Sequence, residues 1–271
     1  MTSGIVLLDK PAGLSSNHAT RRLQRLFGAA SAGHLGTLDP FATGLLPVML
    51  GDATRLIRWL EGGDKVYRAE VCFGTTTDTL DREGAVLERR PVPADLDERL
   101  RAALPSFVGR LRQRVPEYSA AKVGGVRRCD LARAGRSVEP KYKDVEVRSL
   151  RRVEPARGEP ASDAGGVSGT GGAGGSAESG RVALEVTCGG GTYVRQLVAD
   201  LGQAVGCGAH TVGLRRTRVG TFGAELAVTF ETIEPIILES RVSLFIDPRR
   251  HLPGPVWSAG EAEWGRLERG Q

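Results

Sequence analysis

The sequence predicts an α+β fold, because segments with the period of a strand and segments with the period of a helix both recur along the chain. Residues 65–73, KVYRAEVCF, alternate so that Tyr67 faces the opposite way from Val66 and Arg68, which is typical of a strand. Residues 189–206 begin with three glycines and continue with apolar side chains at helical spacing. The length of 271 residues suffices for one large domain, or for one domain with a small appendage.

The first third of the chain predicts a strand, a helix and a second helix. Residues 4–8 form a short apolar run that ends at a charged Asp-Lys-Pro sequence. Ser15 or Ser16 is expected to cap a helix that continues to residue 27. Residues 44–60 begin apolar and continue as a predicted helix from Asp52.

The remaining elements follow the same rules. Turn-forming residues at 74–84 predict a link, and residues 94–107 predict a helix with leucines on one face. Two alternating segments, 145–153 and 181–188, predict strands on either side of the low-complexity residues 156–180. This Gly-, Ser- and Ala-rich stretch cannot bury a core, so we expect an insertion in a hairpin connection without chemistry. Residues 210–222 predict a basic strand.

Composition excludes some functional classes. The chain is 40% apolar and 25% charged, as globular proteins are, and its net charge of +5 is compatible with a polyanionic partner without requiring one. Four cysteines lack C-x-x-C spacing and four histidines lack H-x-x-x-H spacing, so no structural zinc or other metal is expected. The apolar start is broken by Asp9 and Lys10, and no apolar run approaches the roughly 20 residues that span a bilayer. We therefore expect a cytoplasmic protein that does not contact membranes.

A basic segment lies at residues 116–143. It contains seven cations against three anions, together with two consecutive glycines and few core-forming side chains. This composition is typical of an exposed basic arm, although charge alone fits an ordinary solvated loop equally well. The seven cations are Lys122, Arg127, Arg128, Arg133, Arg136, Lys141 and Lys143.

The most informative stretch is residues 33–47, GHLGTLDPFATGLLP. It places a single carboxylate, Asp39, between a glycine-rich approach and a proline, five positions after His34. Glycines at such a place permit unusual dihedral angles and close approach of another molecule, which suggests an acid at the floor of a cleft. The alternative from residue types alone is that Asp39 caps a helix whose first residue is Pro40.

This stretch resembles the signature of the TruB family of tRNA pseudouridine synthases, in which the Asp of GH-x-G-T-L-D-P-x-A-T-G-L-L is the nucleophile. Four further blocks match the same family in the same order, and together they cover most of residues 4–235. The matching blocks are LLDKPAGLSSN at 8–17, KVYRAEVCFGTTTDTLDREG at 65–84, VPEYSAAKVGGVRRCDLARAG at 115–135 and GGTYVRQLVADLGQAVGCGAHTVGLRR at 190–216.

The resemblance implies the pseudouridine synthase fold, a large mixed and mostly antiparallel sheet flanked by helices. It implies a catalytic domain over residues 1–235, with residues 116–143 as an RNA-gripping thumb. Residues 236–271 are then a short C-terminal segment that ends in a fragment like the opening of an RNA-binding PUA module, too short to complete one. The glycine-rich insertion at 156–180 is not part of the family pattern.

The family's catalytic roles pass to three matching residues. Asp39 is the implied nucleophile, Arg195 its partner, and Tyr67 the residue that stacks on the target base and accepts the proton from C5. For Arg195 the alternatives are a surface ion pair or a phosphate contact, and for Tyr67 a core position with its hydroxyl at the rim. The sequence leaves open whether Asp39 attacks C1′, attacks C6 or removes a proton from the sugar.

The family's binding roles pass to further residues. His34 would occupy the space of the flipped-out base, whereas a lone His in such a loop is usually a hydrogen-bonded bystander. Tyr193 and Leu214 would line the uracil pocket, although Leu214 otherwise fits a plain core position. Phosphate contacts are expected from the seven cations of the arm and from Arg215 and Arg216.

The implied function is isomerisation of the tRNA T-loop uridine conventionally numbered 55, without metal or cofactor. The expected partner is the tRNA T-arm, and the enzyme is expected to act as a monomer without guide RNA. One rival is a noncatalytic RNA-binding or RNA-folding protein on the same scaffold. The other is a glycoside hydrolase, which usually needs two facing carboxylates; the acidic candidate near Asp39 in the sequence is Asp52.

Overall fold

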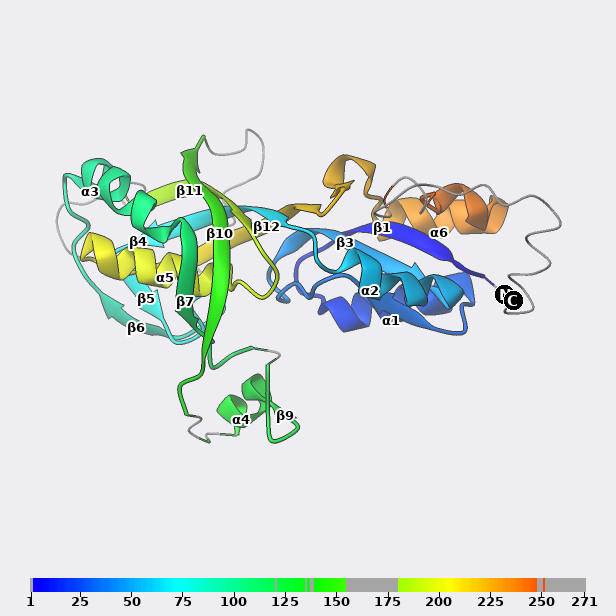
Figure 1. Cartoon of the computed structure of the whole chain (residues 1–271), viewed down its shortest axis with the longest axis horizontal. Helices are drawn as coiled ribbons and strands as arrows, with labels where there is room; N and C mark the ends of the chain where they lie inside the picture. The colour runs from blue at the N-terminus through cyan, green and yellow to red at the C-terminus, as the bar shows by residue number, and fades with distance from the viewer. Residues whose placement is uncertain are drawn as a thin grey trace, which may run out of the picture.

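The computed structural model describes residues 2–119, 121–134, 136, 139–154, 180–247 and 251, and one mixed sheet forms its centre (Figure 1). All neighbouring strands pair antiparallel except β12 and β3, which pair in parallel. The predicted α+β class with a mixed, mostly antiparallel sheet is therefore confirmed. The strand order is β1 (Gly4–Lys10), β3 (Thr43–Leu50), β12 (Ala209–Val219), β4 (Lys65–Phe73), β11 (Arg181–Cys188), β10 (Tyr142–Val153) and β7 (Gly109–Arg114). Two short strands extend it, β2 (Ala32–His34) on β3 and β13 (Phe222–Gly223) on β12.

Helices cover the sheet and divide its core into clusters. Helix α5 (Val194–Val205) and helix α3 (Leu96–Ala103) pack on the half made by β4, β10 and β11. Helices α1 (Ser16–Phe27) and α6 (Phe230–Glu239) pack on β1 and β3 at the other half (Figure 1). The alternation of β4 is as predicted, since every second side chain from Lys65 to Phe73 is buried. Strand β4 therefore presents Tyr67 to the cluster that contains α5.

Several elements differ from the sequence prediction. Residues 44–50 belong to β3. Every residue of this strand after Thr43 is buried, which explains the apolar run in the sequence. The predicted helix from Asp52 is a 3₁₀ turn, η1 (Gly51–Leu56), followed by a short α2 (Ile57–Leu60). The predicted helix over 94–107 ends as α3 at Ala103 and continues as η2 (Leu104–Phe107), where Pro105 lacks the backbone donor of a regular helix.

The link at 74–84 is more ordered than expected. It contributes β5 (Thr75–Thr77), which pairs with β6 (Val86–Arg89) in a separate two-stranded sheet. Leu80 within this link has a φ of 64°, the left-handed region that non-glycine residues rarely adopt. The unusual turn lies directly before Asp81.

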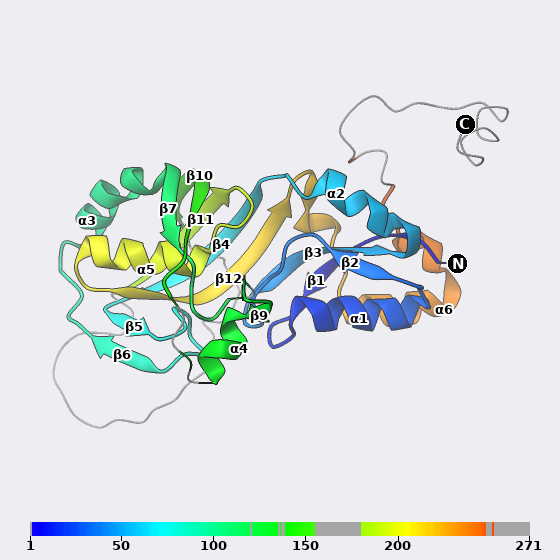
Figure 2. The ribbon, with the colours of Figure 1, turned by 60° about the horizontal axis from the view of Figure 1, so that its bottom comes forward.

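The basic arm projects from the ends of β7 and β10, at the lower edge of the molecule in Figure 1. It contains the hairpin of β8 (Lys122–Val123) and β9 (Val126–Arg127), followed by α4 (Arg128–Arg133). Gly124 and Gly125 form the two-residue turn with φ of 58° and 84°, a conformation that favours glycine. Figure 2 shows α4 and β9 from a second direction, turned by 60° from the view of Figure 1.

The C-terminal part of the described chain packs on the core. The expected domain boundary after residue 235 falls inside α6, and Ile237, Leu244 and Phe245 pack against the cluster around α1. A last 3₁₀ turn, η4 (Arg241–Leu244), lies in this stretch. The glycine-rich residues up to 179 and the PUA-like fragment lie outside the described residues. Among the helices of the described residues, none has the length and apolar character needed to cross a membrane.

Candidate active site

Asp39 lies in the loop between β2 and β3, and it does not cap a helix. The backbone N–H of Ala42 donates to the Asp39 carbonyl at 3.1 Å, which closes a turn, and β3 begins immediately afterwards. Ser16 at the start of α1 anchors the residue before Asp39, because its hydroxyl accepts from Leu38 N at 2.8 Å and donates to Leu38 O at 3.0 Å. The capping alternative is therefore wrong, and the loop is tied to the core by a buried hydroxyl.

The carboxylate of Asp39 is held by the guanidinium of Arg195, near the start of α5. Arg195 Nε donates to Oδ2 at 2.8 Å and Nη2 donates to Oδ1 at 3.0 Å, which is a bidentate pair. The Arg195 side chain is 4% exposed, whereas that of Asp39 is 34% exposed. The guanidinium thus contacts the carboxylate from the protein interior and favours its charged form, while part of the carboxylate is exposed to solvent.

Every N–H group of the Arg195 guanidinium has an acceptor. Besides Asp39, Nη1 donates to Thr79 O at 2.6 Å and to Asp81 Oδ2 at 3.1 Å, and Nη2 donates to Tyr118 O at 2.9 Å. Asp81 is itself buried and accepts from the Thr79 hydroxyl at 2.6 Å through Oδ1. These contacts fix the plane and direction of the guanidinium.

Asp81 was missed by the sequence reasoning. The signal was present, since this second carboxylate lies in the block at 65–84 that matches the family. Asp52, which the hydrolase alternative required, instead lies on η1, is 77% exposed and is 3.9 Å from Arg55. It does not line the cavity beside Asp39.

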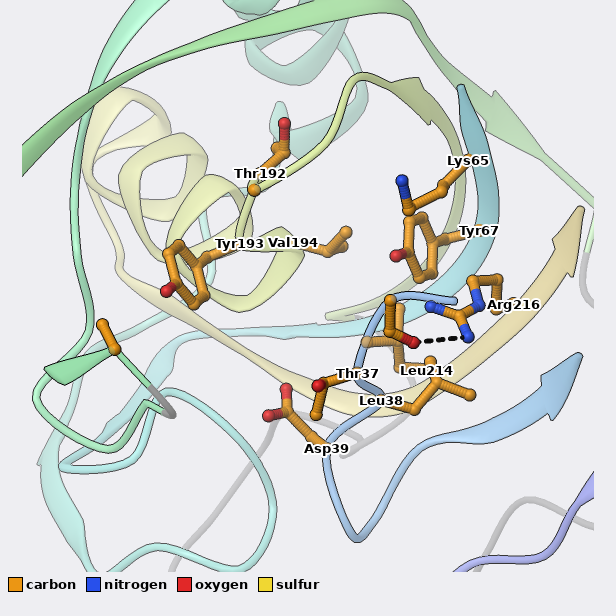
Figure 3. Close-up of a pocket in the computed structure, with 13 residues that line it drawn as sticks. Thr37, Leu38, Asp39, Lys65, Tyr67, Thr192, Tyr193, Val194, Leu214 and Arg216 are labelled. Carbon is orange, nitrogen blue, oxygen red and sulfur yellow. Dashed lines mark hydrogen bonds between the residues drawn. The ribbon is translucent and has the colours of Figure 1, made fainter. Parts of the chain in front are cut away.

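That cavity has a volume of about 330 Å³, and Asp39 is one of the residues that line it (Figure 3). Tyr67, Tyr193 and Leu214, which were predicted to contact substrate, all lie on its walls, with Tyr193 across the cavity from Tyr67 (Figure 3). The described residues that line it are Gly36, Thr37, Leu38, Asp39, Lys65, Tyr67, Ala121, Gly191, Thr192, Tyr193, Val194, Leu214 and Arg216.

Tyr67 is almost completely buried. Burial raises the pKa of its hydroxyl, and the positive charge of Arg216 opposes this only in part. The phenol is therefore protonated at neutral pH in the resting protein. Its ring is available as an apolar wall, and its oxygen can take up a proton only if its own proton moves to another acceptor.

A buried lysine, Lys10, connects the loop that carries Asp39 to the segment that follows β1. Lys10 Nζ donates to Pro11 O and Leu14 O at 2.7 Å and to Pro40 O at 3.3 Å, directly after Asp39. Burial lowers the pKa of Lys10 to about 8, against the opposing attraction of Asp39. The sequence predicted no role in the site for Lys10.

His34 lies beside the cavity rather than on its wall. Its Nδ1 is 3.0 Å from the Thr20 hydroxyl and its Nε2 is 3.4 Å from the Thr37 hydroxyl. Burial lowers the pKa of the imidazole, which favours the neutral ring. The proposed insertion of His34 in place of a flipped base stays a prediction.

Two of the predicted phosphate contacts are not free surface cations. Arg216 is completely buried and donates to the carbonyl oxygens of Leu35, Gly36 and Leu45, so it links the loop that carries Asp39 to strand β3. Arg215 is partly buried and forms two hydrogen bonds with the Asp9 carboxylate at 3.0 and 2.7 Å. The predicted phosphate contact of Arg216 does not fit this burial, because its position on β12 faces the interior of the protein.

Arg128 requires the same correction. It is 0% exposed, and its guanidinium donates to Pro116 O at 3.4 Å and to Glu139 O at 3.0 Å, which ties the two ends of the arm together. Arg136, Lys141 and Lys143 are exposed, as expected. The side chains of Lys122, Arg127 and Arg133 lie outside the described part of the structure.

Comparison with known proteins agrees with this geometry. Residues 24–194 match the model described as TruB family pseudouridylate synthase (N terminal domain), and residues 195–248 match the tRNA pseudouridylate synthase B C-terminal domain. The chain belongs to the TruB family. Among the described residues of this TruB-family chain, no cluster of three or more His, Cys, Asp or Glu side chains could hold a metal ion.

Individual TruB relatives are similar over most of the chain. The tRNA pseudouridine synthase B of Xanthomonas campestris pv. campestris (strain B100) is 43% identical over 234 residues, which is 86% of this chain and 69% of the relative. The protein of the same name from Aromatoleum aromaticum is also 43% identical, over 90% of this chain and 72% of the relative. The TruB-family chain is thus an enzyme, an isomerase of the tRNA pseudouridine synthase class.

Solved structures support the TruB fold as well. The chain aligns to a chain of a Cbf5-Nop10-Gar1 complex with a TM-score of 0.60 and 27% identity, covering 86% of this chain. It aligns to the archaeal box H/ACA sRNP Nop10-Cbf5 complex with a TM-score of 0.56 and 25% identity. In both cases it spans little more than half of the matched chain, 54% and 53%.

Proposed function

We propose that this enzyme converts the T-loop uridine of tRNA conventionally numbered 55 into pseudouridine, with Asp39 as the group that starts the reaction. One observation supports this proposal above the others. The partly exposed carboxylate of Asp39 accepts hydrogen bonds from Nε and Nη2 of Arg195. It lines a cavity that has Tyr67 on its wall. The cavity of about 330 Å³ provides room for a single base with part of its sugar.

The reaction needs little besides a positioned carboxylate. The C1′–N1 bond breaks, the detached uracil turns while it remains in the cavity, and a bond forms between C1′ and C5. The C5 proton then leaves and N1 gains a proton, so that no atom is gained or lost overall. A carboxylate can serve as a covalent catalyst at such a centre, either at C1′ or at C6 of the base.

Access to the cavity requires the nucleotide to leave its stack, at a cost of a few kcal/mol. We assign to the basic arm and its exposed Arg136, Lys141 and Lys143 the contacts with RNA phosphates that offset this cost. Recognition by shape and phosphate contacts suits a structured RNA loop. On this proposal the enzyme acts in the cytoplasm, as a monomer and without a guide RNA.

The test is incubation of unmodified tRNA with the wild type and with Asp39→Ala, without added RNA, followed by mapping of pseudouridine at single-nucleotide resolution. We expect conversion at position 55 by the wild type and none above background by the variant. A tRNA with cytidine at position 55 is the matched substrate control. Conversion by Asp39→Ala would contradict the role of the carboxylate, and conversion only at other uridines would contradict the T-loop assignment.

A further inference from the structure

Two cationic side chains lie next to each other on the wall of the cavity that contains Tyr67. Lys65 begins β4 two residues before Tyr67, so both side chains lie on the same face of the strand. Arg216 is the register partner of Tyr67 on β12. Lys65 and Arg216 are seen on either side of the Tyr67 ring in Figure 3.

Both side chains keep donors that the described residues do not use. Lys65 is 8% exposed, and its ammonium has one acceptor in the described structure, Gly63 O at 3.1 Å, although it carries three N–H groups. Arg216 Nε and Nη2 donate to backbone carbonyls, whereas the buried Nη1 has no hydrogen-bond partner among the described residues. The guanidinium nonetheless lies close enough to the Tyr67 hydroxyl to counteract part of the rise in its pKa. A buried donor without an acceptor is destabilising, so its place on a cavity wall points to an acceptor that arrives with the substrate.

A glycine makes room for this pair. A Cβ atom on Gly36 would lie 3.0 Å from Lys65 Cε and 3.3 Å from Arg216 Nη1, and the φ of 67° is itself one that favours glycine. The catalytic loop thus passes close to both cations. Packing them together is unfavourable, and burial together with the charge of Arg216 lowers the pKa of Lys65.

The carboxylates nearby offset this charge only in part, since Glu61 and Asp64 favour the charged form of Lys65 less than burial and Arg216 oppose it, and the pKa stays lowered. Asp39 is already paired with Arg195, and Asp64, next to Lys65 in the sequence, lies 3.5 Å from the guanidinium of Arg148. The wall of the cavity beside Tyr67 therefore carries positive charge and free donors. Such a wall fits a ligand with oxygen atoms that become negative during the reaction.

Uracil becomes such a ligand on either route open to Asp39. When the C1′–N1 bond breaks, its electron pair remains on N1 and is delocalised onto O2 and O4. When a carboxylate instead adds to C6, the electron pair of the C5–C6 bond moves onto O4 as an enolate. We propose that Lys65 Nζ and Arg216 Nη1 donate to the uracil carbonyl oxygens and stabilise this negative charge. The inference rests on the proposed function and adds two residues to it.

The test compares Lys65→Met and Lys65→Gln with the wild type, and uses Arg101→Met on exposed α3 as a control for the loss of one positive charge. Single-turnover rates at saturating enzyme, the Kd for tRNA and the melting temperature are measured for each. We expect Lys65→Met to lower the rate about 100-fold with a Kd within twofold of the wild type, as for loss of one oxyanion donor. Lys65→Gln should melt within a few degrees of the wild type, because its amide can still donate to Gly63 O, and should nonetheless lose most of the rate.

A second substrate separates charge stabilisation from simple positioning. In 5-fluorouridine the fluorine withdraws electrons and already stabilises a negative ring, so the deficit of Lys65→Met should shrink when tRNA carries this base. Loss of the original nucleotide in a single turnover is the readout, because release of a C5 proton is impossible there. An equal deficit with both bases would contradict the inference.

Two other results would overturn it. A rate of Lys65→Met within twofold of the wild type would show that the ammonium does not act on the ring. An unchanged rate at saturation, with a weaker Kd and a shallower salt dependence, would instead assign Lys65 to an RNA phosphate. All rates refer to the uridine that the wild type converts, so a wild type that converts none contradicts the proposed function, whereas a full-rate Lys65→Met contradicts this inference alone.

Discussion

The Asp39 carboxylate and the Arg195 guanidinium, 156 positions apart in the chain, are joined by two hydrogen bonds of 2.8 and 3.0 Å. The first comes from a loop after β2 and the second from the start of α5, so the pair exists only because the sheet brings these elements together. The arginine is buried and fully hydrogen-bonded, whereas the carboxylate is partly exposed. On the proposed function, this asymmetry makes the arginine a fixed support and the carboxylate the group that meets the substrate.

We expect Arg195→Lys to lower the rate of pseudouridine formation by about 10- to 100-fold, because hydrogen bonds to charged groups contribute about 1.5–3 kcal/mol each. An ammonium cannot reproduce a bidentate fork, nor can it reach Thr79 O and Tyr118 O at the same time. Single-turnover kinetics on tRNA would measure the change. Near-normal turnover would reject the pairing as a requirement for catalysis.

Asp81→Asn should leave the Asp39–Arg195 contact in place and weaken its support. The amide keeps the shape of the side chain but removes the negative charge next to a buried guanidinium, so the free energy of unfolding should fall, by up to about 3 kcal/mol. Urea denaturation would measure it. Asp52→Asn is the matched control, because the exposed Asp52 should contribute less than about 1 kcal/mol. Equal effects of the two variants would argue against a supporting role of Asp81.

Tyr67→Phe should bind tRNA with nearly the affinity of the wild type, since the ring and its stacking surface remain. If the hydroxyl takes part in moving the C5 proton, the rate should fall by about 10²- to 10⁴-fold. Binding and single-turnover assays on the same preparation separate the two effects. Turnover at the wild-type rate would show that another group accepts this proton.

Within the basic arm, Lys141→Ala should flatten the salt dependence of tRNA binding by roughly 0.7 in the slope of log K against log salt, the value for one lost phosphate contact. The contrast is Arg128→Ala, which removes a buried link between Pro116 O and Glu139 O. Its main effect should be faster amide exchange across the arm. An unchanged slope for Lys141→Ala would mean that this lysine does not contact RNA.

Much of the local structure could be predicted because it depends on near neighbours in the chain. The alternation of residues 65–73 predicted the strand β4 and put Tyr67 on the face opposite Val66, which the structure shows to be the buried one, and a serine cap predicted the start of α1. Where the prediction failed, a distant partner decided the outcome. Residues 44–50 are a strand because β1 pairs with all of them, while β12 pairs at Gly44 and β2 pairs at residues 48–50. No local pattern shows those partners.

Charge gave a less reliable prediction than order along the chain. Arg128, Arg215 and Arg216 look like surface cations in the sequence, yet the structure uses two of them to satisfy buried backbone carbonyls and one to pair with Asp9. An arginine can take either role, because its donors bind a carbonyl oxygen as readily as a phosphate. Only the surroundings decide between them.

The sequence by itself determined the family, the α+β class and the carboxylate at residue 39, because these follow from residue types and their order. Only the tertiary structure decided that Asp81 holds Arg195 and that Lys65 and Arg216 meet behind Gly36. These contacts join segments that are far apart in the chain. The physical reason is that hydrogen bonding and burial depend on distances in space, which the pairing of strands sets and which spacing in the sequence does not contain.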